Sequence, residues 1–285
     1  MLAFNHIGSL GRLGNQMFEY AALRGIAARH GYDWCIPTYD RKGIENYSLH
    51  FCFNMEDVKE DNLCVREDYG YVQERCFHFD EELARDCPDN VSLYGFFQSE
   101  KYFKNVEDVI RKEYTFCNEH LEPCKQMIDT LEGQEPIMLH VRRGNPNLTD
   151  SRGFKWSYTQ CGDMHPTQTV EYYEEALSHF DDEQPVVVFS DSIEWVKEQP
   201  FFQGDRFLLS EPEETYADGS FTPYADLCLM SLCSHAIIAN SSMSWWGAWL
   251  QTNPNKKVIA PKRWFGPAYA DKDTKDLYCP DWIVL

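Results

Sequence analysis

The sequence lacks any uninterrupted apolar stretch long enough to cross a membrane. No window of about 18 apolar residues occurs in it. The first residues, Met1-Leu2-Ala3-Phe4-Asn5-His6, carry neither the positive charge nor the apolar run of a signal peptide. These absences predict a soluble protein that is made and kept in the cytoplasm, with no transmembrane segment. They leave peripheral contact with a membrane open.

The chain is also poor in positive charge. Its 285 residues include 26 Lys and Arg against 46 Asp and Glu, which gives a formal net charge of -20. Proteins that bind a DNA or RNA backbone normally present a basic face, so this composition argues against nucleic acid as a partner. An anionic small molecule would need a local basic pocket.

The cysteines lack the spacing of metal sites and disulfide scaffolds. There are 11 of them, an odd number, and none forms a C-x-x-C pair. We therefore expect no metal site and mostly reduced thiols, with Cys228 and Cys233 in the core.

A glycine-rich segment near the start lacks the order of a nucleotide-binding fingerprint. It reads Gly8-Ser9-Leu10-Gly11-Arg12-Leu13-Gly14-Asn15-Gln16. Neither the G-x-G-x-x-G order nor the Lys-Ser/Thr end of a P-loop is present, which disfavours NAD and ATP chemistry. Two interpretations stay open: a plain turn from a strand into a helix, and close approach of the backbone to a ligand, with Asn15 and Gln16 supplying amide groups.

What the sequence does have is a regular alternation of strand-like and helix-like segments in its second half. Strands are predicted at 136–142, 185–189, 206–209, 235–239 and 257–260, and helices at about 167–180, 193–199, 223–234 and 244–251. In the first half, the sequence predicts strands at 2–7 and 35–37, a helix that ends at His30-Gly31, and helices near 101–114 and 119–131. The alternation is typical of βαβ units and predicts an α/β fold with a parallel sheet.

Three polar clusters follow three of the predicted strands. They are Arg142-Arg143, Ser190-Asp191-Ser192 and Asn240-Ser241-Ser242. Ligands of open parallel sheets bind outside the carboxyl ends of the strands, so this coincidence predicts a binding site. Arginine forks fit phosphate oxygens, a helix start offers N–H groups to an anion, and a carboxylate can accept bonds from guanine or ribose. Ion-paired arginines and plain helix caps remain the alternatives, and the Trp245-Trp246 pair is interpreted as core packing.

Several motifs together resemble one enzyme family. They are Gly11-Arg12-Leu13-Gly14-Asn15-Gln16-Met17-Phe18, His140-Val141-Arg142-Arg143-Gly144, Phe189-Ser190-Asp191, Asp226-Leu227 and Ser241-Ser242-Met243-Ser244-Trp245-Trp246-Gly247-Ala248-Trp249. In this order and at these spacings the chain is similar to the α-1,2-fucosyltransferases, which belong to glycosyltransferase family 11.

The resemblance implies an architecture and a reaction. It implies a GT-B-like fold of two Rossmann-like domains with parallel sheets, an acceptor-side domain over residues 1–134 and a GDP-fucose-binding domain over 135–285. The donor would be GDP-β-L-fucose and the acceptor a galactose-containing glycan, joined through the galactose 2-hydroxyl with inversion at the fucosyl carbon. No metal and no other cofactor is implied. Asp271-Lys272-Asp273 resembles a metal-binding D-x-D motif, but no strand precedes it, and we interpret it as a solvated turn.

By motif position, the resemblance also implies roles for single residues. Arg142 would hold the β-phosphate, with Arg143 and His140 supporting the site. Asp191, beside Ser190, would contact the nucleoside. Asn240, Ser241 and Ser242 would bind phosphates, and Asn15, flanked by Gly14 and Gln16, would lie beside the sugar or the acceptor.

One position departs from the family pattern. The family run usually continues Arg-Arg-Gly-Asp, whereas this chain has Asn145, which cannot accept a proton. A substitute base is then needed from Asp150, Asp163, His165 or Glu19, unless a dissociative reaction needs little base assistance.

Two other functions stay open: a catalytically silent module that binds a glycan or nucleotide, and a GDP-sugar transferase of different linkage.

Overall fold

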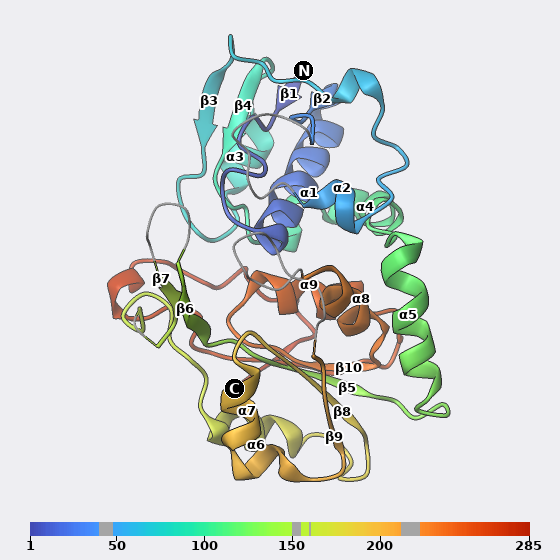
Figure 1. Ribbon diagram of the computed structural model, residues 1–285. Helices are drawn as coiled ribbons and strands as arrows, with labels where there is room; N and C mark the ends of the chain where they lie inside the picture. The colour runs from blue at the N-terminus through green and yellow to red at the C-terminus, as the bar shows by residue number, and fades with distance from the viewer. Residues whose placement is uncertain (40–47, 150–154, 160, 212–222) are drawn as a thin grey trace. The chain divides into compact units, whose positions relative to one another are not determined.

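The computed structural model of the chain describes residues 1–39, 48–149, 155–159, 161–211 and 223–285, and of residues 145–149 and 155–157 the backbone alone. These residues form two compact units, each built on a parallel sheet (Figure 1). Unit 1 comprises Met1–Cys117 and Lys272–Cys279, and unit 2 comprises Asn118–Asp271 and Pro280–Leu285. The predicted α/β class is confirmed.

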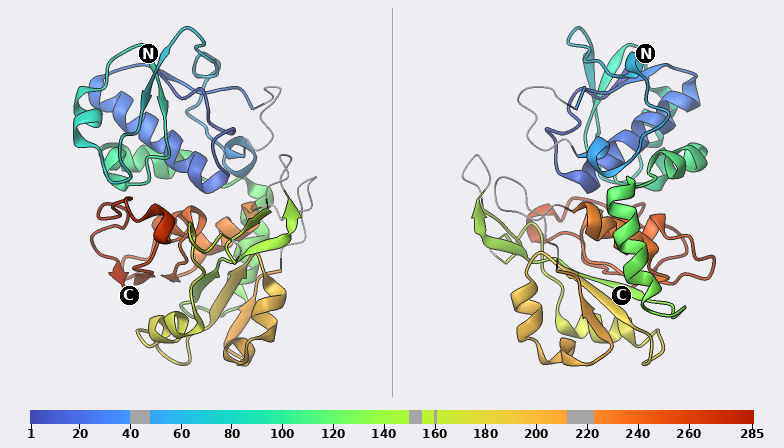
Figure 2. Two further views of the ribbon diagram at one scale, coloured as in Figure 1. Left: turned by 90° about the vertical axis from the view of Figure 1, so that its left-hand side faces the viewer. Right: turned by 45° about the vertical axis from the view of Figure 1, so that its right-hand side comes forward.

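The compact units divide at residue 117 rather than at the expected 134. The reason is α5 (Asn118–Asp129), which packs against α8 (Tyr224–Leu232) of unit 2, as the green and orange helices of Figure 2 show. The assignment of acceptor and donor to separate domains stays a prediction.

Unit 1 contains a short parallel sheet in the order β2-β1-β4-β3. Its strands are β1 (Leu2–Ala3), β2 (Trp34–Cys35), β3 (Gly70–Gln73) and β4 (Val91–Tyr94). The helix expected after the glycine-rich loop is α1 (Leu13–His30), which ends at Gly31 in the left-handed conformation with φ 69°. Residues around most of its circumference are buried, so α1 is the central helix of this unit.

Unit 1 also contains several shorter helical segments. They are α2 (Leu49–Cys52), η1 (Glu60–Asn62), α3 (Glu81–Asp86), η2 (Glu100–Tyr102), η3 (Lys104–Val106) and α4 (Glu107–Glu113). The helix predicted near 101–114 is confirmed only over α4, because two 3₁₀ turns precede it. Tyr102 and Phe103 are both fully buried, and Phe103, at φ -128° and ψ 7°, leaves helical geometry between η2 and η3. Val106, at φ -130° and ψ 26°, does so between η3 and α4.

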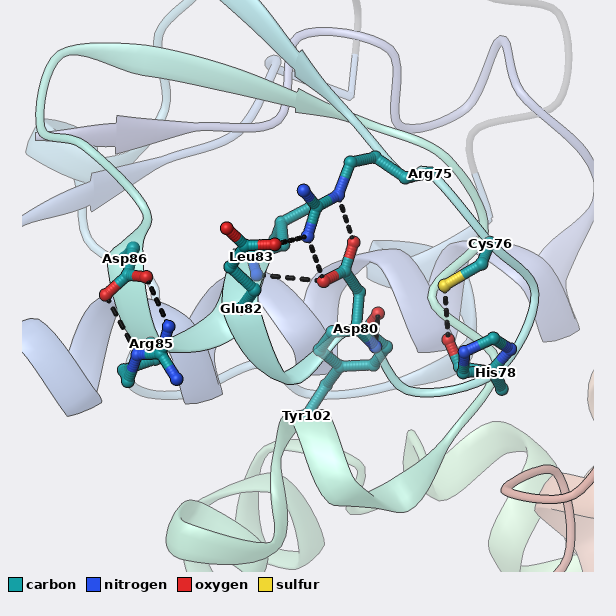
Figure 3. Close-up of polar contacts among 9 residues, drawn as sticks. All are labelled: Arg75, Cys76, His78, Asp80, Glu82, Leu83, Arg85, Asp86 and Tyr102. Carbon is teal, nitrogen blue, oxygen red and sulfur yellow. Dashed lines mark hydrogen bonds and ion pairs between the residues drawn. The ribbon is translucent and has the colours of Figure 1, made fainter.

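Polar contacts fix the segment between β3 and α3 (Figure 3). The Arg75 guanidinium donates two hydrogen bonds to the Asp80 carboxylate, each 2.6 Å long. Asp80 also caps α3 by accepting the Leu83 N–H over 2.9 Å, and its own N–H donates to the Tyr102 hydroxyl. This network ties the β3–α3 connection to the last residue of η2.

Unit 2 contains a parallel sheet of six strands in the order β12-β11-β10-β5-β8-β9. The strands are β5 (Ile137–Val141), β8 (Val186–Ser190), β9 (Phe207–Leu209), β10 (His235–Ile237), β11 (Val258–Ala260) and β12 (Ile283–Val284). The five strands predicted for this half are confirmed, and β12 was missed because it is a two-residue strand. A two-stranded antiparallel sheet, β6 (Gly144–Thr149) with β7 (Lys155–Ser157), follows β5.

Helices cover both faces of this sheet, as its four fully buried inner strands require. On one face α6 (Val170–Leu177) and α7 (Ile193–Glu198) pack against Leu139 and its apolar neighbours. On the other, α8 and α9 (Ser242–Leu250) meet at Gly247, where a Cβ would lie 2.8 Å from Cβ of Met230. Trp245 and Trp246 are fully buried in this layer, which confirms their interpretation as core, and Cys228 and Cys233 are buried as expected.

The remaining helical turns of unit 2 are η4 (Pro200–Gln203) and η5 (Pro267–Tyr269).

Across the described ranges, no helix is both long and apolar enough to span a bilayer.

Candidate active site

The three polar clusters of unit 2 follow strands that are neighbours in the sheet. β5 pairs in parallel with β10 on one side and with β8 on the other. The register places Val141 opposite Ser190, so Arg142 and Asp191 leave their strands side by side. The predicted convergence of these clusters at one edge of the sheet is confirmed.

The segment after β8 holds the turn after β5. The Asp191 carboxylate accepts the backbone N–H of Arg143 over 2.9 Å and of Gly144 over 2.8 Å. Ser192 donates its hydroxyl hydrogen to the Gly144 carbonyl over 2.9 Å. Its own N–H donates to the Ser190 hydroxyl. Ser190 to Ser192 are therefore a clamp on the turn that carries the two arginines.

Arg142 is the best-anchored cation of this edge. Its Nη1 donates to Asp191, and its guanidinium lies 5.0 Å from the centre of the Tyr158 ring. Burial opposes its charge, but Asp191 and Tyr158 outweigh burial and raise the pKa of the guanidinium. Its Nε is buried and has no hydrogen-bond partner among the described residues. The group is thus permanently charged and retains donor capacity for an anion.

Arg143 and His140 flank it in different ways. The Arg143 guanidinium stacks on the Trp195 ring of α7 at 3.9 Å, a cation–π contact that orients the fork. His140 is buried at the end of β5, and burial, assisted by Arg142, lowers the pKa of its imidazole to about 4. Its Nδ1 has no partner within the described chain. A neutral ring of this kind can donate or accept one hydrogen bond to a ligand.

The third cluster combines one buried residue, Asn240, with two half-buried serines. Asn240 is buried, its amide donates to the carbonyls of Pro166 and Trp264, and it accepts from Gln168. These bonds fix the Asn240 side chain, and its phosphate contact stays a prediction. Ser241 is the N-cap of α9, yet within the described chain its side chain makes no capping bond, and Ser242 begins the helix.

In unit 1, the glycine-rich loop brings Asn15 to the start of α1. Gln98 donates from Nε2 to Oδ1 of Asn15 over 2.9 Å. Gly14 is buried in the first turn of α1. Gln16 is fully buried, accepts the Ser48 N–H over 2.9 Å and donates to the Gly11 carbonyl. Both ends of this amide bond the protein itself, so Gln16 supports the loop, and its contact with a substrate stays a prediction.

The structure describes the side chains of only some of the candidate bases. Asn145 lies in β6 but its side chain is outside the described residues, and so is Asp150. Asp163 is exposed, and Glu19 is fully buried in α1. His165 stacks on Tyr158 with ring centres 5.1 Å apart, and Tyr158 also contacts Arg142. Of the described candidates, His165 is therefore the one linked to the arginine turn.

Among the described residues, no cluster of potential metal ligands stands beside this edge. In the described part of the chain, no three His, Cys, Asp or Glu side chains gather where they could hold an ion. Asp271 and Asp273 are exposed, and Asp273 accepts the Lys275 N–H over 3.0 Å, in keeping with a solvated turn. Independence from metal stays a prediction.

Sequence reasoning missed three residues that shape these sites. They are Trp195, Tyr158 and Gln98, which contact residues far along the chain. No local pattern in the sequence indicated them. Ser192 was named within its polar cluster, but its bond to Gly144 was not predicted.

Comparison with known proteins agrees with these observations. The sequence profile of glycosyl transferase family 11 matches residues 2–285. An α-1,2-colitosyltransferase of Escherichia coli is 28% identical over 90% of this chain and 90% of its own length. The O-antigen biosynthesis glycosyltransferase WbnK of Escherichia coli is 27% identical over 96% of this chain and 98% of its own length. Human galactoside α-(1,2)-fucosyltransferase 1 is 25% identical over 84% of this chain and 63% of its own length.

Solved structures share the fold. The fucosyltransferase NodZ from Bradyrhizobium superposes with a TM-score of 0.52 at 14% identity, covering 88% of this chain and 91% of NodZ. POFUT1 in complex with GDP gives 0.50 at 12% identity, covering 91% of this chain and 97% of POFUT1. The architecture is thus GT-B-like, as predicted.

Proposed function

The chain belongs to glycosyl transferase family 11, and from this premise we propose that it is an inverting galactoside α-1,2-fucosyltransferase. It would move L-fucose from GDP-β-L-fucose to the 2-hydroxyl of galactose in a glycan acceptor. The observation that carries the proposal is the clamped arginine turn. Asp191 fixes Arg142 and the backbone at Gly144 beside two neighbouring strand ends, and no described residue bonds the buried Nε of Arg142.

The proposed reaction is a direct displacement. The acceptor hydroxyl oxygen forms a bond to the fucosyl carbon as the bond from that carbon to the β-phosphate oxygen breaks. GDP leaves with the electron pair, and the hydroxyl proton passes to a base. Negative charge grows on the departing phosphate, where Arg142 and the N–H groups at the start of α9 would stabilise it without reorganising.

Further residues would support this step. Arg143, oriented by Trp195, and neutral His140 would complete the donor site, and Asn15 would contact the sugar or the acceptor. His165 is our candidate for the proton acceptor in place of Asn145, because ring contacts link it through Tyr158 to Arg142. In this proposal, Asp191 contacts the nucleoside while it also holds the arginine turn.

A second donor is favoured by one comparison. The similar Escherichia coli protein is an α-1,2-colitosyltransferase, and colitose is fucose without its 3-hydroxyl. A site built to hydrogen-bond a hydroxyl rejects the analogue that lacks it by about ten-thousandfold or more, whereas an apolar site discriminates weakly. The ratio of kcat/KM for the two donors therefore decides between them.

The test is turnover of purified protein with GDP-fucose and GDP-colitose against a panel of galactosides, with linkage and anomeric configuration of the product determined by NMR. Formation of an α-1,2-linked fucoside supports the proposal. Tight GDP binding without transfer to any acceptor would leave a silent binding module, and another linkage would identify a different GDP-sugar transferase.

We also propose that transfer needs no metal, because arginine and the α9 start already supply positive potential at the strand ends. Activity should survive EDTA. Loss in EDTA that Mg²⁺ or Mn²⁺ restores would contradict this part of the proposal.

A further inference from the structure

Asn15 is held in one orientation by a residue far along the chain. The Gln98 side chain is 7% exposed, and its Nε2 donates to Oδ1 of Asn15 over 2.9 Å although 83 positions separate the two residues. Because the Asn15 carbonyl oxygen accepts this bond, a flipped amide would set one NH₂ group against another. The contact therefore decides which end of the Asn15 amide is the donor.

The opposite side of Asn15 is closed by backbone. Gly11 has φ +86°, and a Cβ at this glycine would lie 2.4 Å from Nδ2 of Asn15. The Asn15 side chain thus fits against a glycine on one side and is hydrogen-bonded by Gln98 on the other. A side chain on a mobile loop would not need such close packing.

The loop that carries Gln98 is itself built around a half-buried carboxylate. Glu74, which directly follows β3, accepts the N–H of Phe96 over 2.9 Å and the N–H of Phe97 over 3.0 Å. Phe97 is fully buried and adopts φ +51°, a left-handed conformation that is costly for a bulky residue. Such strain persists only where the surroundings determine it, and it concentrates at functional sites.

A second anchor holds the same loop a few residues later. The Tyr102 ring packs edge-on against Phe97 with centres 5.1 Å apart, and its hydroxyl accepts the Asp80 N–H (Figure 3). The segment from Phe96 to Tyr102 is therefore fixed on both sides of Gln98. This is more structure than a surface connection requires.

We propose that Gln98 is a positioning residue for transfer: it fixes the Asn15 amide so that its N–H end is presented to the sugar or acceptor. The inference rests on the proposed function, because Asn15 matters only if it contacts a substrate. Gln98 acts through Asn15 and touches no substrate itself. A donor group held in one orientation contributes to turnover by avoiding reorganisation at the moment of reaction.

The experiment is a double-mutant cycle of Asn15→Ala and Gln98→Ala, with Gln98→Glu as an isosteric variant that lacks the donor and Gln126→Ala, at an exposed position of α5, as the control. For each folded protein we would measure kcat, the GDP dissociation constant and the free energy of unfolding in urea. Each single substitution should lower kcat by about a hundredfold. In the Asn15→Ala background, Gln98→Ala should change kcat by less than about twofold.

GDP affinity should be unchanged throughout, because the proposed GDP contacts belong to unit 2, and Gln98→Glu should lose as much activity as Gln98→Ala. Two outcomes would overturn the inference. One is that the two substitutions change the activation free energy additively, and the other is that Gln98→Ala is as active as wild type. If wild type transfers no sugar, the proposed function fails by itself. The same double-mutant cycle, measured as the free energy of unfolding, then still decides whether Gln98 fixes Asn15. A coupling energy between the two substitutions is expected, and additive destabilisation would show that Gln98 does not fix Asn15.

Discussion

Asp191 accepts the backbone N–H of Gly144 over 2.8 Å, so a side chain at the end of β8 holds the turn that follows β5. The same carboxylate binds Arg142 and the N–H of Arg143. A donor that is oriented before substrate arrives costs no reorganisation in the transition state. We therefore propose for Asp191 a role in turnover that does not depend on contact with the nucleoside.

Asp191→Asn tests this role. Asparagine leaves one acceptor oxygen where the carboxylate has two, and a hydrogen bond that involves a charged group contributes about 1.5–3 kcal/mol. We expect kcat to fall by about ten- to a hundredfold, which is that energy expressed as a rate. Asp182→Asn, at a side chain that is 97% exposed, is the control.

Inhibition by nucleotides separates the two roles of Asp191. If the clamp is its whole contribution, GDP and ADP should lose affinity in the same proportion in Asp191→Asn. A selective loss of GDP inhibition would show that Asp191 also reads guanine.

Arg142→Ala should abolish most transfer while the protein remains folded. Removing a donor from a developing anion typically costs about a hundredfold or more in kcat. Arg142→Lys should also lose most activity, because lysine lacks the planar fork that could bond Asp191 and the proposed phosphate at once. Steady-state kinetics on protein with wild-type circular dichroism checks both, with Arg85→Ala, whose side chain is 63% exposed, as control. Near wild-type kcat in Arg142→Ala would remove this residue from the mechanism.

Asn145→Asp tests whether the missing acid limits the rate. If position 145 can serve as base, the substitution should raise kcat by about a hundredfold to ten-thousandfold and add an acidic limb to the pH–rate profile. If the rate and its pH dependence stay the same, the proton leaves by another route. His165→Gln is then expected to lower kcat more than Asp163→Asn, because His165 is linked by ring contacts to the arginine turn.

The donor-side edge of the sheet was predictable because its signals are local. β5 and β8 are apolar strands that end in polar residues, and helices follow them, so a parallel sheet with Arg142 and Asp191 at one edge could be inferred. The partner of Asp191 could not. That the carboxylate bonds the arginine turn depends on the register of two strands some 50 residues apart, and the sequence of neither strand specifies it.

Unit 1 was harder to predict because its strands are short and its key contacts are distant. β3 has four residues, of which three are exposed, so it shows no hydrophobic alternation. Gln98 follows Phe96 and Phe97 and looks like one polar residue in an apolar run. Its importance comes from Asn15, 83 positions away, and no local pattern reports such a contact.

Gly11→Ala should disable the enzyme by displacing Asn15. A Cβ at Gly11 would approach Nδ2 of Asn15 to 2.4 Å, and φ +86° is unfavourable for alanine by about 1–2 kcal/mol. Gly31→Ala is a matched control, because Gly31 has φ +69° but nothing lies within 4 Å of its Cβ position. Both variants should lose similar stability in urea unfolding, and only Gly11→Ala should lose turnover. Equal kcat in the two variants would show that Asn15 tolerates displacement.

Glu19 gives the protein a stability that depends on pH. It is fully buried in α1, and within the described residues neither carboxylate oxygen has a hydrogen-bond partner. Burial, with a smaller effect of nearby Glu74, raises the pKa of Glu19 well above its ordinary value of 4.5. The folded protein therefore holds this proton at pH values where the unfolded chain has released it. Stability from Glu19 is complete below about pH 4.5 and is lost as pH rises toward the folded pKa.

Glu19→Gln removes this titration while keeping the shape of the side chain. The difference in unfolding free energy between variant and wild type should grow in favour of the variant between pH 5 and 8, by up to about 1.4 kcal/mol for each pH unit. Glu74, whose pKa burial raises to about 7, is present in both proteins, so its own titration largely cancels. Urea unfolding at each pH measures the difference, and Glu198→Gln, at an exposed position in α7, should show none of it. A difference that is constant across this pH range would mean that Glu19 is already ionised in the folded protein, and the buried carboxyl would then need a cationic partner.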